Sequence, residues 1–217
     1  MKKLIVFDLD GTLLDTSTGI IHCYRKAGQA LNLVPNNVEN EKFVIGGPLS
    51  HGFEYLYQME SEEQVQNAVD IYRSTYQTEG INMFVAYQDI DKMLEALKGN
   101  GYMLAVATLK LESYAKQMLK AAGIANYFDI IHGWDGTEKC TKAFILTKVL
   151  YSLNTITTDA LLVGDSDYDA KGADATGIDF LGVTYGFGIH KNDSTKTRPA
   201  YPLADSPDDV LDYIINS

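Results

Sequence analysis

The 217-residue sequence has few cysteines and no long apolar run. Its two cysteines, Cys23 and Cys140, stand far apart and neither belongs to a Cys-x-x-Cys pair, so we expect neither a zinc site nor a disulfide framework. The four histidines also lack the spacing of metal ligands. No stretch of about 18 apolar residues is present, which argues against a membrane-spanning helix.

Basic residues are outnumbered, with 18 Lys and Arg against 29 Asp and Glu and a net charge of -11. Binding along a nucleic-acid backbone requires clusters of Lys and Arg, so no nucleic-acid partner is expected. A small anionic substrate is compatible with this charge, because local charge within a cleft decides its binding. The N-terminus lacks the longer apolar stretch and the cleavage site of a signal peptide. We therefore expect a cytoplasmic protein, monomeric or homodimeric, with no membrane partner.

Five continuous apolar runs have the character of strands. They cover residues 3–8, 102–108, 128–132, 160–164 and 179–184. Such runs, which do not alternate with polar residues, are typical of strands buried on both faces of a parallel sheet. Helical patterns cover residues 89–98, 111–122, 141–153 and 206–216. Their alternation with the apolar runs predicts an α/β fold with a doubly wound, Rossmann-like parallel sheet.

Residues 16–82 interrupt this alternation. They hold helical patterns at 17–32, 48–59 and 61–79 and no convincing strand. We predict a Rossmann-like core made of residues 1–15 and 83–217, with an inserted α-helical cap domain at 16–82. The insert is rich in tyrosine, which is expected to pack its interior: Tyr24, Tyr55, Tyr57, Tyr72 and Tyr76.

The first apolar run ends in two carboxylates, in the stretch LIVFDLDGTLLDT that begins at Leu4. In an extended chain Asp8 and Asp10 point to the same side, about 7 Å apart. At an effective dielectric constant of about 20, two ionised carboxylates at this distance repel each other by roughly 2–2.5 kcal/mol. In open α/β sheets the functional site lies beyond the carboxyl ends of the strands. The pair therefore indicates such a site.

Further polar side chains follow the other predicted strands. These are Thr108 and Lys110 after the second run, Lys142 at the start of the helix after the third, and Asp165, Asp167 and Asp169 after the fourth. If the strand ends converge, a divalent cation such as Mg²⁺ would neutralise the acids and bind a substrate phosphate. One aspartate can accept the phosphoryl group, and a second can act as acid and base. The pattern predicts a Mg²⁺-dependent site for phosphoryl transfer.

Four segments in this order resemble the motifs of the haloacid dehalogenase superfamily. They are DLDGTLLDT at 8–16, VATLK at 106–110, TKAFIL at 141–146 and VGDSDYDAKGADATG at 163–177. The resemblance covers nearly the full chain and points to the branch of phosphoglycolate-phosphatase-like and 5'-nucleotidase-like hydrolases with a helical cap. It implies a phosphomonoester hydrolase that forms an aspartyl-phosphate and acts on a small phosphorylated metabolite.

The resemblance also implies catalytic and metal-binding roles for four aspartates. Asp8 would be the nucleophile and Asp10 the acid and base. Asp8, Asp165 and the backbone carbonyl of Asp10 would bind Mg²⁺, and Asp169 would orient the metal shell. Residues 16–82 would close over the site and exclude water until the aspartyl-phosphate forms.

Phosphate binding is implied for a hydroxyl, an ammonium group and three backbone amides. Thr108 and Lys142 would supply the side chains, and Leu9, Gly11 and Leu109 would supply the amides. Relatives usually have a polar residue where Leu109 stands. Because that contact uses the backbone, we expect catalysis to survive while substrate polarity changes.

The branch resemblance rests on two further segments. In the insert, residues 45–49 resemble the family's Ile-Gly-x-Pro-Leu loop, so we expect Gly46, Gly47 and Pro48 to shape the substrate end of the site. The segment GWDGTEKCTK is similar to relatives that hydrolyse phosphoglycolate or nucleoside monophosphates. These compounds are therefore the expected substrates.

Two other members of the superfamily were weighed. A sugar-phosphate mutase would carry a cap histidine at the position matching Ile20 and Glu-Asp-Ser in place of Gly164-Asp165-Ser166. A dehalogenase has no use for the second acid at Asp10. Both comparisons favour the hydrolase.

A phosphate-accepting receiver module is an alternative of another class. Receivers are also acidic α/β domains that take phosphate on an aspartate and carry a lysine and a hydroxyl. They are much shorter than this chain and have no helical insert after the first strand. The insert at 16–82 therefore favours the enzyme.

Overall fold

The computed structural model describes residues 2–36, 44–137, 140–190 and 201–216. The chain divides into two compact units. Unit 1 comprises Met1–Leu14 and Ala86–Ser217, and unit 2 comprises Asp15–Val85. The chain crosses between them at two short strands, β2 (Leu14–Asp15) and β3 (Val85–Ala86), which pair as a two-stranded sheet. That residues 16–82 act as a cap stays a prediction.

Unit 1 is built on a six-stranded sheet in the order β5-β4-β1-β6-β7-β8, in which every pairing is parallel. The strands are β1 (Leu4–Phe7), β4 (Met103–Leu111), β5 (Ile130–Trp134), β6 (Ala160–Gly164), β7 (Asp179–Val183) and β8 (Leu203–Ala204). All four side chains of β1 are fully buried, as the continuous apolar run predicts. The predicted doubly wound α/β fold is confirmed.

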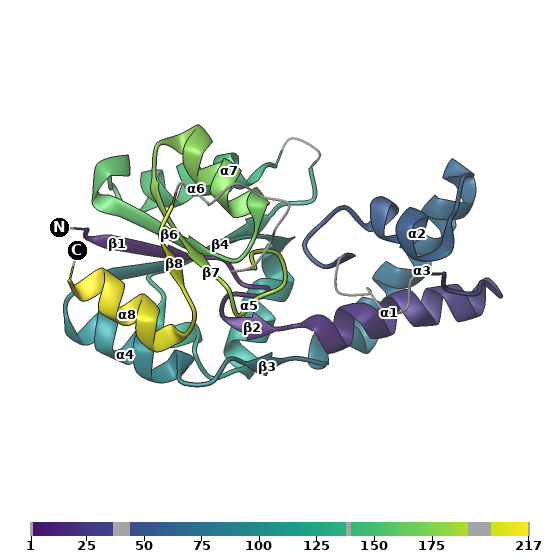
Figure 1. Ribbon diagram of the computed structural model, residues 1–217, viewed down its shortest axis with the longest axis horizontal. Coiled ribbons are helices and arrows are strands. Elements are labelled where there is room, and N and C mark those ends of the chain that lie inside the picture. Colours follow the sequence, from purple (N-terminus) through teal and green to yellow (C-terminus); the bar gives the residue numbers. More distant parts are fainter. Residues whose placement is uncertain (1, 37–43, 138–139, 191–200, 217) are drawn as a thin grey trace. The chain divides into compact units, whose positions relative to one another are not determined.

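Helices cover both faces of this sheet, with α6 and α7 on one face and α4 and α8 on the other (Figure 1). The helices of unit 1 are α4 (Ile90–Gly99), α5 (Glu112–Ala121), α6 (Lys142–Ser152), α7 (Asp167–Thr176) and α8 (Pro207–Ile215). Short 3-10 turns lie at Ala125–Tyr127 and Thr157–Asp159. The predicted helices at 89–98, 111–122, 141–153 and 206–216 are confirmed within one or two residues.

The sequence identified one helix start correctly and missed one helix. The pattern at 89–98 places Asp89 at the N-cap of α4, and it lies there, but it has a φ of 63° and makes no capping hydrogen bond, since its carboxylate pairs with Lys92 instead. Helix α7 was not predicted, because the acids of its first turn were interpreted only as site residues. Acids in a first turn stabilise the N-terminus of a helix as well.

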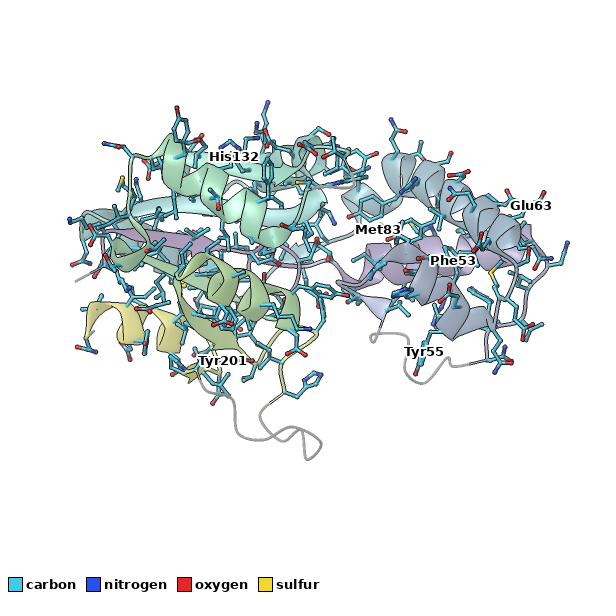
Figure 2. All side chains as sticks on the ribbon, turned by 90° about the horizontal axis from the view of Figure 1, so that it is seen from above. Phe53, Tyr55, Glu63, Met83, His132 and Tyr201 are labelled. Carbon is cyan, nitrogen blue, oxygen red and sulfur yellow. The ribbon has the colours of Figure 1, made fainter. Side chains whose placement is uncertain are left out.

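Unit 2 is helical, with α1 (Ser17–Ala30), α2 (Leu49–Tyr57), α3 (Glu62–Thr78) and a 3-10 turn at Gly80–Asn82. Its interior is aromatic. The ring centroid of Tyr24 lies 4.8 Å from that of Phe53 and 4.9 Å from that of Tyr72. Tyr57 and Tyr76 are also buried, whereas Tyr55 is 38% exposed. Figure 2 labels Phe53 and Tyr55 in this unit. The tyrosines therefore pack the interior of this unit, with Tyr55 as the exception.

Among the described residues, no helix is long and apolar enough to cross a membrane.

Three strands adjacent in the sheet position the predicted site. β1 lies between β4 and β6, with Phe7 level with Val106 on one side and Val163 on the other (Figure 1). Asp8 and Asp165 directly follow β1 and β6, and Thr108 lies near the carboxyl end of β4. Because parallel strands end at the same edge, these residues meet although they are far apart in the sequence.

Candidate active site

Asp8 is the first residue after β1, and its amide donates to Val163 O at 2.9 Å. This hydrogen bond continues the β1–β6 ladder by one residue, so the backbone at Asp8 is fixed by the sheet. The Asp8 side chain is buried. A buried carboxylate requires a compensating cation or hydrogen bonds, which indicates a functional rather than a turn-forming aspartate.

Asp8, Asp165 and Asp169 form a cluster of three buried carboxylates. One oxygen from each lies within 4.8 Å of the oxygens of the other two. Asp165 follows β6, and Asp169 lies in the first turn of α7. Carboxylate oxygens at this spacing are the donor set that Mg²⁺ takes from proteins. The residues of this cluster therefore fit the predicted metal.

Lys142 provides the positive charge inside this cluster. Its ammonium Nζ lies 2.6 Å from Asp8 Oδ1, 2.6 Å from Asp169 Oδ1 and 2.6 Å from Ala107 O. The side chain is 5% exposed and starts from the first residue of α6, which Thr141 caps by accepting a hydrogen bond from Phe144 N. One buried cation thus pairs with two of the three carboxylates of the cluster, which leaves a surplus of negative charge.

Burial, together with neighbouring negative charges, raises the pKa values of two acids in this cluster. Burial raises the pKa of Asp8 to about 7, aided by the charges of Asp169 and Asp10 and opposed by Lys142. Burial also raises the pKa of Asp165 to about 8, with Asp169 and Asp8 adding to the effect. Burial alone would lower the pKa of Lys142, but the charges of Asp169 and Asp8 outweigh it and raise that pKa. A bound divalent cation would relieve this repulsion.

Asp169 has both oxygens occupied. Oδ1 pairs with Lys142, and Oδ2 accepts hydrogen bonds from the amide of Ser166 at 3.1 Å and from its hydroxyl at 2.6 Å. The Ser166 hydroxyl in turn accepts from the Asp169 amide, which completes a capping box at the start of α7. The same contacts thus begin the helix and hold Asp169 in place.

Asp10 does not point its carboxylate into the triad of Asp8, Asp165 and Asp169. Its two oxygens lie 3.0 and 2.9 Å from Nζ of Lys110, in an ion pair with side chains 17% and 9% exposed. From its place after the second predicted strand, Lys110 could be either a supporting charge near the phosphate or a solvated one. The structure places it on the predicted acid and base.

A break in the β4–β5 register brings Lys110 there. Between Ala107 and Leu111 the pairing with β5 shifts, so residues 108–110 form an irregular segment at the strand end. Thr108 is buried there, and its Oγ1 accepts the amide of Lys110 at 3.2 Å. Irregularities of this kind commonly re-aim side chains beside active sites.

The three residues whose backbone amides are predicted to bind phosphate, Leu9, Gly11 and Leu109, differ in their surroundings. The Gly11 amide donates to Leu14 O at 2.9 Å, so a phosphate oxygen would have to compete with this bond. Leu9 is buried, and the side chain of Leu109 is partly exposed.

The predicted specificity residues belong to unit 2. Gly46, Gly47 and Pro48 are exposed and lead into α2. Glu138 and Lys139, within the segment GWDGTEKCTK, lie outside the described residues.

The sequence reasoning missed the loop that follows β7. The amides of Phe187 and Gly188 donate to Asp165 Oδ2 at 2.6 and 3.3 Å, and the Tyr185 hydroxyl donates to Thr12 O at 3.1 Å. Two glycines could have indicated this loop. Gly186 and Gly188 follow the predicted strand at 179–184, at the functional edge of the sheet.

Curated relatives cover almost the whole chain. "Probable phosphatase IndB" of Dickeya dadantii is 32% identical over 97% of this chain and 93% of its own. A 5'-nucleotidase of Pseudomonas aeruginosa is 31% identical over 93% and 90%. A phosphoglycolate phosphatase of Aquifex aeolicus is 32% identical over 91% and 93%. Tyrosine-protein kinase PtkA of Mycobacterium tuberculosis is 33% identical over 86% of this chain, which spans 63% of that longer protein.

A solved structure and a family profile agree with these relatives. A haloacid dehalogenase-like family hydrolase from Streptococcus pneumoniae superposes with a TM-score of 0.88 at 33% identity, covering 98% of each chain. The profile of the haloacid dehalogenase-like hydrolases matches residues 5–183. The chain therefore belongs to the haloacid dehalogenase-like hydrolase family and is a phosphatase of that family.

Proposed function

We propose that the chain is a Mg²⁺-dependent phosphomonoester hydrolase that forms an aspartyl-phosphate on Asp8. The observation that carries this proposal is the buried cluster of Asp8, Asp165 and Asp169, with oxygens within 4.8 Å of one another and Lys142 beside them. Phosphoryl transfer depends mainly on positioning and on neutralising charge, and this cluster is suited to both.

In the first half of the reaction, Asp8 attacks the phosphorus atom. Lys142 binds Oδ1 of Asp8, so we assign the attack to Oδ2. The bond from Asp8 to phosphorus forms as the ester P–O bond breaks, and Asp10 gives a proton to the leaving oxygen. In the second half, Asp10 takes a proton from water as the water attacks phosphorus, which releases inorganic phosphate and restores Asp8.

Thr108 and Lys142 are the side chains we assign to the phosphate oxygens, together with the amides of Leu9, Gly11 and Leu109. Thr108 is buried at the end of β4, and the Lys142 ammonium stands between Asp8 and Asp169. Both groups therefore lie at the edge of the sheet where Asp8 would carry the phosphoryl group.

Mg²⁺ would be held by Asp8, Asp165 and the backbone carbonyl of Asp10, with Asp169 orienting the shell. When bound, it supplies positive charge and a centre that accepts phosphate oxygens. The raised pKa values of Asp8 and Asp165 support this assignment, because burial, with the neighbouring negative charges adding to it, disfavours the ionised carboxylates that a bound cation would stabilise.

Small phosphate esters such as phosphoglycolate or a nucleoside monophosphate are the substrates we propose. Two relatives carry names for these activities. We further propose that unit 2, through Gly46, Gly47 and Pro48, contributes to selection of the leaving group.

The test is release of inorganic phosphate from p-nitrophenyl phosphate, with and without Mg²⁺, followed by a panel of phosphoglycolate, nucleoside monophosphates and sugar phosphates. We expect many turnovers per protein molecule. EDTA should abolish this phosphatase activity, and Mg²⁺ should restore it. Stoichiometric phosphorylation that then stops would indicate a receiver, and isomerisation of a sugar phosphate without net release would indicate a mutase. Either result would contradict the proposal.

Mg²⁺ should stabilise the protein more at pH 8 than at pH 5.5. The pKa values of Asp8 and Asp165 are raised in the fold, so without metal these groups oppose folding increasingly as pH rises from about 4 to 8. Mg²⁺ requires the ionised carboxylates and therefore binds better at the higher pH. At a concentration of 100 times Kd the gain is about 2.7 kcal/mol, or about 5–10 °C in Tm for a chain of this size.

Thermal melts with and without Mg²⁺ at the two pH values measure this shift. The variant Asp165→Asn should lose it, whereas Asp174→Asn, at an exposed position on α7, should keep it. An equal shift at both pH values would show that the buried acids are not the binding groups.

Lys110→Met should reduce general acid catalysis. The ion pair confines the Asp10 carboxylate, which is only two residues from Asp8 and would otherwise be repelled by it. We expect kcat/KM for an alkyl phosphate to fall about 10-fold, less than the roughly 10²–10⁴-fold of a full acid–base contribution because Asp10 itself is kept, and that for p-nitrophenyl phosphate to change much less. The reason is that p-nitrophenolate leaves without protonation.

Steady-state kinetics on both substrates check this prediction, with Lys116→Met on α5 as the control. Lys116 pairs with Glu112 on the surface and should show no dependence on the leaving group. Equal losses on both substrates for Lys110→Met would refute the assignment.

A further inference from the structure

One oxygen of Asp165 is held by the loop that follows β7. Oδ2 accepts the amide of Phe187 at 2.6 Å and the amide of Gly188 at 3.3 Å. The side chain is 3% exposed. Two fixed N–H donors on one oxygen restrict rotation of the carboxylate, yet an ionised carboxylate keeps lone pairs for a cation. Backbone donors of a separate loop therefore determine how Asp165 faces the cluster.

This contact requires the absence of a side chain at Gly186. A Cβ built there would stand 2.5 Å from Asp165 Oδ2 and clash with Gly11 O. The backbone at Gly186 is not in the left-handed region, so space alone requires glycine here. Gly11, with a φ of 82°, requires glycine for conformation as well, and a Cβ there would stand 2.6 Å from Asp165 Cγ. Asp165 is thus enclosed by two glycines from different segments.

The loop is also tied to the turn after β1. The hydroxyl of Tyr185 donates to Thr12 O at 3.1 Å, and its ring contacts that of Tyr87 edge-on at a centroid distance of 4.9 Å. The segment after β7 thus connects the turn that carries Asp10 with the end of β6 that carries Asp165. A shift of this loop would move Asp165 relative to Asp8.

We propose that the loop Thr184–Ile189 is a positioning element for the metal site. It sets the affinity for the divalent cation by orienting Asp165 through the amides of Phe187 and Gly188, and it contributes no ligand of its own. The inference rests on the proposed Mg²⁺ site. Groups that orient metal ligands typically change metal affinity by about 10–100-fold when they are lost.

The experiment measures binding of Mn²⁺, the probe for the site, from the electron paramagnetic resonance signal of the free ion. Gly186→Ala should raise the dissociation constant about 10-fold or more. Gly188→Ala should have a smaller effect in the same direction, because its Cβ would lie 3.0 Å from Asp165 O. Gly99→Ala is the matched control, since a Cβ there would meet nothing within 4 Å beyond its chain neighbours and the backbone of its own helix. Phosphatase activity of Gly186→Ala should recover in excess Mg²⁺.

Unchanged Mn²⁺ affinity in Gly186→Ala would overturn the inference. If that variant does not fold, unchanged affinity in Gly188→Ala overturns it instead. Asp165→Asn separates this result from the proposed function. Loss of Mn²⁺ binding in Asp165→Asn with normal binding in the glycine variants would reject only the role of the loop. Retained binding and activity in Asp165→Asn would reject the metal site itself.

Discussion

Asp8→Asn is expected to abolish turnover, with a loss of at least about 10⁴-fold in kcat, the scale seen when a nucleophile is removed. Asparagine has the shape of aspartate but cannot form the aspartyl-phosphate. The backbone at this position is fixed by the hydrogen bond from Asp8 N to Val163 O, which the substitution leaves in place. The loss should therefore come from chemistry and not from misplacement.

The fold should survive this change. Lys142 keeps Asp169 and Ala107 O as partners within 2.6 Å, so its buried ammonium group is not left alone. Circular dichroism should match that of the native protein, with Asp174→Asn as the control that keeps activity. A denaturant melt without metal should show at least native stability, because the raised pKa of Asp8 means that its ionised carboxylate opposes folding. Phosphate release at a near-native rate from a folded Asp8→Asn protein would show that another group is the nucleophile.

Lys142→Met should lower both the rate and the stability. Its ammonium group contacts Asp8, Asp169 and Ala107 O, and all three would lose their cation. Breaking a buried ion pair by removing one partner costs about 3–5 kcal/mol. Loss of a preorganised charge at the transferring group lowers kcat by about 10²–10³-fold. Methionine keeps most of the aliphatic stem, which packs against Gly172 on α7.

The destabilisation should depend on pH and on Mg²⁺. At pH 5.5 Asp8 is largely protonated, since its pKa lies at about 7. Loss of the lysine therefore leaves fewer unpaired negative charges at pH 5.5 than at pH 8. Urea melts without metal should therefore show the larger loss at pH 8, and Mg²⁺ should recover part of it. Lys148→Met, on the same helix and 42% exposed, is the matched control. Equal stability of Lys142→Met and native protein at pH 8 would contradict the account.

The apolar patterns of the sequence predicted most strands and helices of unit 1 correctly. Continuous apolar runs identified the five longer strands. A strand covered by helices on both faces is apolar along its whole length, because neither face contacts solvent. The two-residue strands β2, β3 and β8 were missed, since two residues show no periodicity. Asp89 stands at the N-cap of α4 as predicted, but its side chain makes no capping hydrogen bond, and its positive φ could not be read from the pattern.

For the site, the sequence by itself determined which residue types follow the strands, and it predicted that Asp8, Thr108, Lys142 and Asp165 would meet if the strand ends converge. Only the tertiary structure decided that Lys110 pairs with Asp10 and that the amides of Phe187 and Gly188 hold Asp165. The physical reason is that strand positions and side-chain burial follow from local apolar patterns. Contacts between loops instead depend on register shifts and on space between backbones, neither of which leaves a periodic trace in the sequence.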